Sequence, residues 1–153
     1  MSTVHAVFTT FFISMVPVLE LRGAIPVGVA GGLSPLFAMI LAVIGNMVPV
    51  PFVILFIRRI FSWLKRWPKL CPVIEKLEQR GSAKSLTVRK YERLGLFILV
   101  AIPLPGTGAW TGALVAALMN MRLKSALPSI FLGVLTAGFL VTCLSYGVLH
   151  LLG

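Results

Sequence analysis

The sequence predicts an all-α integral membrane protein, built as an inverted repeat in which each half is a re-entrant helical hairpin followed by a transmembrane helix. Of the 153 residues, 58% are hydrophobic and only 12% are charged, unlike the balance in soluble domains. Three stretches carry no charge and exceed the roughly 20 residues that cross a bilayer: residues 23–57, 94–121 and 125–153. They lack the polar-apolar alternation of membrane barrels, so we expect helices.

The first apolar region is interrupted by glycines, prolines and a charged pair. These residues are Pro17, Glu20, Arg22, Gly23, Pro26, Gly28, Gly31 and Gly32. The apolar arms on either side, about residues 7–18 and 25–30, are each too short to cross a bilayer, which predicts a re-entrant hairpin buried in protein or lining a cavity. A full span is expected over residues 35–57, kinked where Pro49 and Pro51 remove helix hydrogen bonds.

The middle of the chain, residues 58–93, is predicted to be a cytoplasmic amphipathic helical connector. All but one of the fourteen basic residues lie between Arg58 and Lys124, and basic segments stay in the cytoplasm. Tryptophans and aliphatic residues interleave with these charges, as in a helix that lies in the headgroup layer. Aromatic patterns for base stacking are missing, so the net charge of +10 does not indicate nucleic acid.

The second half, residues 94–153, repeats the plan of the first. A short apolar arm covers residues 94–102, a break rich in glycine and proline covers residues 103–112, and a returning arm covers residues 113–119. A full span is expected over about residues 125–152. The chain is therefore predicted to form a single membrane domain, residues 1–153, with the first half at 1–57.

Prolines and glycines of the two halves match at a nearly constant offset. The matching pairs are Pro17 with Pro103, Gly23 with Gly108, and Gly45 with Gly133. Because the connector is cytoplasmic, the first span must start outside and the second inside, so the halves have opposite orientation and both termini are expected outside. Broken segments at matching positions of inverted halves indicate a transport site at the midplane. The alternative is four ordinary spans with proline kinks.

Glu20 and Arg22 are the only charged residues outside the basic segments. Ionisable groups at membrane depth normally pair, face a cavity, or mark an ion or substrate path. Two interpretations stay open: a buried ion pair that fixes the hairpin, or a functional pair. In the second, Glu20 exchanges a proton or binds a cation, and Arg22 neutralises it or holds an anionic group.

The second break has no charge, so a ligand there must meet backbone groups, hydroxyls or ring faces, and half-helix ends would favour an anion. The alternative is plain packing of two hairpins. Candidate substrate- or ion-binding residues are Glu20, Arg22, Gly23, Pro26, Pro103, Pro105, Gly106, Thr107, Gly108, Trp110 and Thr111. Asn46 and Asn120 are further polar groups, for which interhelical hydrogen bonds are expected.

Enzyme chemistry has no support in the sequence. It contains no nucleophile with a base, no carboxylate pair and no metal-ligand spacing, so we predict no catalytic residue, metal or cofactor. Cys71 and Cys143 are far apart, and neither a disulfide nor a metal site is expected.

Two motifs carry a family resemblance. Residues 20–26, ELRGAIP, and 102–112, IPLPGTGAWTG, resemble the signatures of the putative small multidrug export protein family, which implies a small membrane exporter. The chain is also similar, more remotely, to the DedA family, whose members are implied to move undecaprenyl phosphate across the bacterial membrane with paired re-entrant hairpins. The DedA pattern has acidic residues in the first hairpin, which Glu20 matches, and arginines in the second, where this chain has none.

These features predict a small multi-pass transporter of the inner (plasma) membrane, with proton- or ion-coupled export of a small or amphipathic substrate. One alternative is a flippase for an undecaprenyl-phosphate-type lipid carrier, with Arg22 on the headgroup. Another is a non-transporting membrane scaffold that uses the basic connector as a docking surface. Expected partners are membrane lipids and a small-molecule or lipid-phosphate substrate, with no nucleic acid. So short a chain encloses little space, which makes a homodimer a further expectation.

Overall fold

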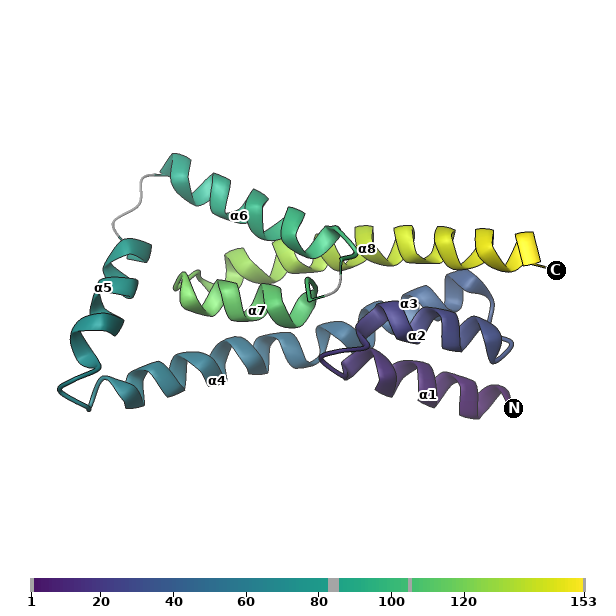
Figure 1. Ribbon diagram of the computed structural model, residues 1–153, viewed down its shortest axis with the longest axis horizontal. Coiled ribbons are helices and arrows are strands. Elements are labelled where there is room, and N and C mark those ends of the chain that lie inside the picture. Colours follow the sequence, from purple (N-terminus) through teal and green to yellow (C-terminus); the bar gives the residue numbers. More distant parts are fainter. Residues whose placement is uncertain (1, 83–85, 105, 153) are drawn as a thin grey trace.

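The computed structural model describes residues 2–82, 86–104 and 106–152, and every regular element in them is an α-helix (Figure 1). The predicted all-α class is therefore confirmed. In chain order the helices are α1 (Thr3–Met15), α2 (Glu20–Ala30), α3 (Pro35–Met47), α4 (Pro49–Leu64), α5 (Cys71–Ser82), α6 (Leu86–Ala101), α7 (Ala109–Leu118) and α8 (Leu123–Leu152). Within the described residues, two stretches are long and apolar enough to cross a membrane, Pro35–Leu64 and Leu123–Val148.

Helices α1 and α2 form a hairpin whose turn lies at the centre of the elongated molecule, while the N-terminus lies at one end (Figure 1). The predicted break between residues 18 and 25 is wrong, because α2 already begins at Glu20 and continues through Pro26. Burial of Leu21 and Ile25 in the core favours the helix. Pro26 removes only one helix hydrogen bond, to a carbonyl near the start of α2.

The first predicted span consists of two helices in series. Ser34 caps α3 by accepting a hydrogen bond from the Phe37 N–H at 3.4 Å. The helix is interrupted at Val48, and Pro49 starts α4, which confirms the predicted interruption at the prolines. Helix α4 continues to Leu64 and includes the first basic residues of the connector, so the helix extends beyond the predicted span, whose end at residue 57 stays a prediction.

The second half contains a matching hairpin and one long helix. Helix α6 leads from the α5 end to the centre, α7 returns toward the α5 end, and α8 passes along the whole molecule (Figure 1). The second break is shorter than predicted, because α7 starts at Ala109. Helix α8 has 30 residues and tolerates Pro128 near its start. Both termini lie at the end opposite α5 (Figure 1).

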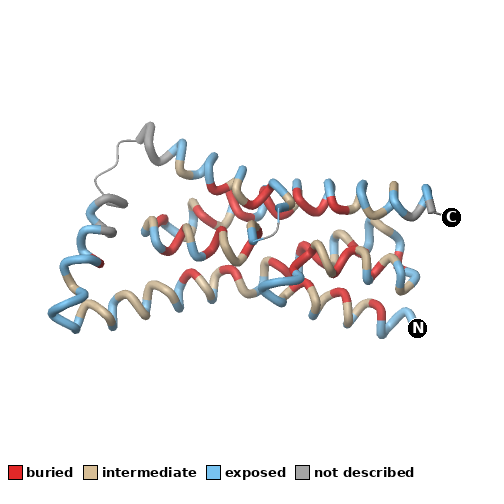
Figure 2. Tube along the Cα trace, viewed as in Figure 1, coloured by how far each residue is buried: buried red, intermediate tan, exposed pale blue. Residues whose placement is uncertain are grey.

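Buried residues line the helix sides that face one another in the middle of the molecule (Figure 2). Many are small: the core includes Ala24, Ala42, Ala113, Ala116, Ala126 and Ala137. Small residues let helix backbones approach closely. Large apolar side chains instead lie outside, with Phe8, Phe52 and Phe56 about 60% exposed or more, as expected of surfaces that contact lipid rather than water.

Both hairpins end in the same type of turn. After α2, Gly32 has a φ of +93° and the Leu33 N–H donates to the Gly28 carbonyl at 3.0 Å. After α7, Asn120 has a φ of +52° and the Met121 N–H donates to the Ala116 carbonyl at 2.9 Å. Each is a Schellman turn, which requires a residue that tolerates the left-handed region.

Close glycine contacts also match between the halves. A Cβ atom on Gly45 of α3 would lie 2.7 Å from the Phe11 carbonyl oxygen of α1. One on Gly133 of α8 would lie 3.0 Å from the Phe97 carbonyl oxygen of α6. The long helix of each half therefore packs against the backbone of the outer hairpin helix at a glycine.

Candidate functional site

The turns of the two hairpins contact each other at the centre of the molecule. The first turn comprises residues 16–19, and the described residues of the second are 102–104 and 106–108; the two hairpins come from opposite ends (Figure 1). Their contacts are made by three side chains: Glu20, Arg22 and Trp110. Each of these binds a helix end of the other hairpin.

Glu20 holds the start of α7. Its side chain is only 5% exposed, and its backbone has a φ of +47°, a conformation that costs a non-glycine residue roughly 1–2 kcal/mol. The carboxylate Oε1 accepts a hydrogen bond from the Trp110 N–H at 3.3 Å. Trp110 is the second residue of α7, so the negative charge lies at the positive end of a helix dipole.

Gly108, the residue before α7, has to be small because of this carboxylate. Any Cβ atom at position 108 would overlap the Glu20 carboxylate, including Oε2 and Cδ. The Gly108 backbone is extended, with a φ of 174°. The glycine is therefore explained by close approach rather than by conformation.

Arg22 holds the end of α6 and the turn that follows it. Its guanidinium donates to the carbonyl oxygens of Ile102, at 3.3 Å, and of Leu104 and Thr107. It also donates to the Thr107 hydroxyl oxygen at 3.1 Å. A positive charge at the C-terminal end of a helix complements the dipole, and it provides donors for carbonyls that have no partner within the helix.

Trp110 is a side chain of the second hairpin that binds the first. Its indole Nε1–H donates to the carbonyl oxygen of Met15, the last residue of α1, at 3.1 Å. Each hairpin thus provides hydrogen-bond partners for the backbone of the other.

A direct ion pair between Glu20 and Arg22, one of the two interpretations left open by the sequence, is not what joins the hairpins. Among the described residues these two charges form no direct ion pair, and each binds a different part of the second hairpin. Sequence spacing suggested the pair because the two residues are close in the chain. The structure separates them because their partners lie on two different helix ends.

The other predicted site residues lie around these contacts. The Thr111 hydroxyl donates to the Gly106 carbonyl at 2.7 Å. Gly106 has a φ of +82°, a conformation that glycine adopts easily. Gly23 packs against Leu19 of its own hairpin. Pro103 is partly buried beside the turn and Pro26 lies further along α2, whereas Pro105 is outside the described residues.

Asn46 differs from its expected role. It is fully buried in α3, and neither its amide nitrogen nor its amide oxygen has a hydrogen-bond partner, so the predicted interhelical hydrogen bond is wrong. The neighbouring Gly45 contacts Ser14 in the last turn of α1, which places Asn46 near the first hairpin turn.

Among the described residues, no three histidine, cysteine or acidic side chains gather as a metal site would require. The groups available for chemistry at the hairpin turns are one carboxylate, one guanidinium, an indole, two hydroxyls and backbone groups.

A scan of protein families matches residues 20–140 to the family described as "Putative small multi-drug export protein". The chain belongs to this family. The match begins at Glu20, directly after the first hairpin turn, and covers α2, the second hairpin turn and most of α8. Searches of curated proteins and of solved structures found no significant match. The family description, together with two apolar helices long enough to cross a bilayer, indicates a membrane protein of a transport class rather than an enzyme class.

Proposed function

We propose that this member of the export family is a proton- or ion-coupled secondary transporter, which moves a small or amphipathic substrate out across the inner membrane. The observation that carries the proposal is Glu20. It is a buried carboxylate in a strained backbone conformation, and it holds the helix start of the opposite hairpin. Strain and burial of this kind cluster at functional sites.

The proposed topology is an inverted repeat with two re-entrant hairpins. Helices α1, α2 and α7 have 13, 11 and 10 residues, fewer than the roughly 20 that cross a bilayer. The matching turns and glycine contacts of the two halves support the repeat, and the opposite directions of the hairpins support the inversion (Figure 1). The basic α5 end is then cytoplasmic and both termini are outside.

Proton binding at Glu20 would loosen the contact between the hairpins. An ionised carboxylate is favoured at the start of α7 by the helix dipole and by the Trp110 N–H. Protonation removes the charge and weakens both interactions, while Arg22 still holds the end of α6. The first hairpin turn then separates first from the start of α7. Opening and closing of this contact would expose a site between the hairpins alternately to the two sides of the membrane.

Asn46 would provide a polar group beside this path. A buried amide without partners is costly, and in this position it is available to water, an ion or a polar substrate group once the turns separate. Its place next to the last turn of α1 supports such a role.

Transport in proteoliposomes tests the role of Glu20. With the purified protein, an imposed pH gradient should drive movement of a lipophilic cationic dye such as ethidium, and a pH-sensitive dye should report proton movement. Glu20→Gln should abolish both movements while the protein stays folded, because the amide oxygen still accepts from the Trp110 N–H. Glu75→Gln, on exposed α5, is the matched control and should transport like the wild type.

Unchanged coupling in Glu20→Gln would reject Glu20 as the coupling group. The flippase alternative needs Arg22 on a headgroup, but its guanidinium is occupied by carbonyl oxygens of the second hairpin. A non-transporting scaffold would show no movement of dye or protons even with the wild type. No observation in the structure favours either alternative.

A further inference from the structure

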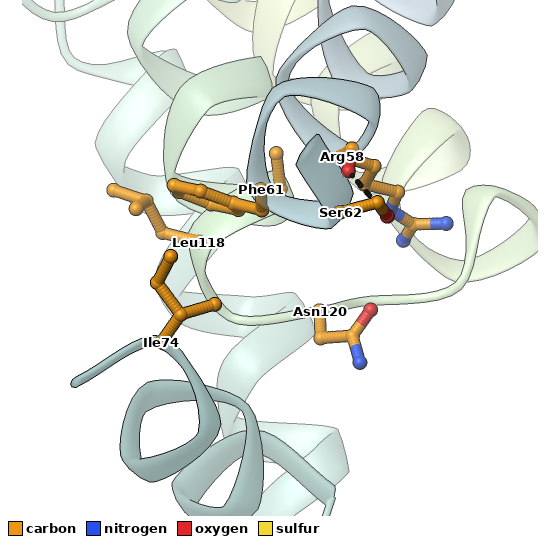
Figure 3. A pocket seen from close by; sticks show the side chains of 7 residues that line it. Arg58, Phe61, Ser62, Ile74, Leu118 and Asn120 are labelled. Atoms are coloured by element: carbon orange, nitrogen blue, oxygen red, sulfur yellow. Dashed lines mark hydrogen bonds between the residues drawn. The ribbon is translucent and has the colours of Figure 1, made fainter. Parts of the chain in front are cut away.

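A second candidate site lies away from the hairpin turns, at the basic end of the molecule. A cavity of about 190 Å³ is enclosed there by α4, the start of α5 and the end of α7. Figure 3 shows six of its lining side chains: Arg58, Phe61, Ser62, Ile74, Leu118 and Asn120. Three are polar and three are apolar, and in this view the two kinds lie on opposite sides of the cavity (Figure 3).

The polar wall has hydrogen-bonding capacity that the protein does not use. Arg58 donates from Nη2 to the Met121 carbonyl, but its buried Nε has no partner. Nε itself is shielded from the cavity, but the guanidinium lines it and has further N–H donors, so an anionic acceptor in the cavity would be favoured. The Asn120 amide lies beside the opening as a further donor (Figure 3).

Ser62 complements these donors with an acceptor. Its hydroxyl donates to the Arg58 carbonyl at 3.0 Å, the dashed line in Figure 3, which leaves its oxygen lone pairs available. A ligand that carries both an anionic oxygen and a hydroxyl would therefore satisfy this wall.

The position of the cavity indicates the source of such a ligand. Trp63, at the end of α4, and Trp67, in the turn after it, follow Ser62; their ring centroids are 6.2 Å apart and both residues are more than half exposed. Tryptophans of this kind mark the headgroup level of a membrane. Leu118, on the apolar wall, is 45% exposed, so this wall continues to the surface that faces lipid.

We propose that this cavity binds the phosphate headgroup of an anionic phospholipid, with the phosphate at the Arg58 guanidinium and the Asn120 amide. The glycerol hydroxyl of a phosphatidylglycerol headgroup would meet Ser62. The upper acyl chain would lie along Phe61 and Leu118. Arginine suits phosphate because its planar donors match the phosphate oxygens.

Bound lipid would stabilise the turn between α7 and α8. Arg58 already joins α4 to this turn through the Met121 carbonyl, and Asn120 holds it in the left-handed conformation. A phosphate between these two side chains would connect them and stabilise the folded protein by mass action. The site is separate from Glu20 and does not depend on transport.

Thermal unfolding of the full-length protein in detergent tests the proposal, with increasing phosphatidylglycerol or phosphatidylcholine in the micelles. Phosphatidylglycerol should raise the Tm of the wild type in a saturable way, and phosphatidylcholine should raise it much less. Arg58→Lys keeps the charge but lacks the planar guanidinium donors, and Asn120→Gly keeps the turn but lacks the amide. Each should weaken the apparent affinity for phosphatidylglycerol about tenfold.

Arg59→Gln is the matched control, because it removes a charge from an exposed neighbour on the same helix and should leave the affinity within about twofold. Wild-type affinity in both Arg58→Lys and Asn120→Gly would overturn the proposal, as would an equal loss in Arg59→Gln. Inorganic phosphate is the third arm. If it alone gave the full stabilisation, the site would bind free phosphate and the lipid proposal would fail.

Discussion

The two hairpins share a backbone plan but differ in chemistry. Each has an outer helix that contacts a glycine of its long helix, and each ends in a Schellman turn. The first hairpin contributes both charged side chains of the contact, Glu20 and Arg22. The second contributes the Trp110 N–H at the start of α7 and the carbonyl oxygens after α6. The two hairpins therefore have matching backbone geometry, whereas the charged side chains at their contact come from the first hairpin alone.

This difference explains how charges persist in an apolar molecule. Charges within a bilayer are expensive unless they find partners. Here the partners are the ends of helices, whose unpaired N–H and C=O groups also need partners away from water. One hairpin contributes ions and the other contributes backbone groups, so both requirements are met at one contact.

The largest expected effect comes from removing the cation. Arg22→Ala removes a charged donor from three carbonyl oxygens of the second hairpin, which should lower the free energy of unfolding by about 3 kcal/mol. The Ile102 and Leu104 carbonyls keep other donors, so the main loss is at the Thr107 carbonyl and in the charge itself. Titration with SDS, followed by loss of helical circular dichroism, measures this. Arg59→Ala, at an exposed position, should change it by less than about 0.5 kcal/mol. Equal effects of the two variants would contradict the role assigned to Arg22.

The matching glycine contacts should respond alike in the two halves. Gly45→Ala and Gly133→Ala each place a Cβ against a backbone carbonyl, and overpacking of this kind should cost about 2 kcal/mol. Gly95 of α6 has open space around it, so Gly95→Ala should instead stabilise by about 0.5–1 kcal/mol. The same SDS titration compares them. A large loss at only one of Gly45 and Gly133 would break the correspondence between the halves.

The smallest effects concern the turns that end α2 and α7. Gly32→Ala puts a side chain at a φ of +93° and should cost about 1 kcal/mol. Asn120→Gly should keep the stability within about 0.5 kcal/mol, because glycine adopts the left-handed conformation easily. Thermal unfolding without added lipid measures both. A loss in Asn120→Gly as large as in Gly32→Ala would show that the two turns are not equivalent.

Much of the candidate site was predictable because charge is rare in this chain. Glu20 and Arg22 stood out as the only charges away from the basic segments, and the glycine-rich second break marked Thr107, Gly108 and Trp110. The start of α2 was mispredicted because glycines and a proline suggested an irregular turn. Burial of Leu21 and Ile25 against other helices outweighed that local preference.

Sequence alone determined the helical class, the two long apolar segments and the existence of the interruptions, because a backbone in an apolar medium must satisfy its own hydrogen bonds. It did not determine the residues at which α2 and α7 begin. Only the tertiary structure decided which helix ends Glu20 and Arg22 bind, that Asn46 has no partner, and that Arg58 and Asn120 share a cavity. Those facts depend on contacts between residues far apart in the chain. Packing of small residues sets these contacts, and no local pattern records them.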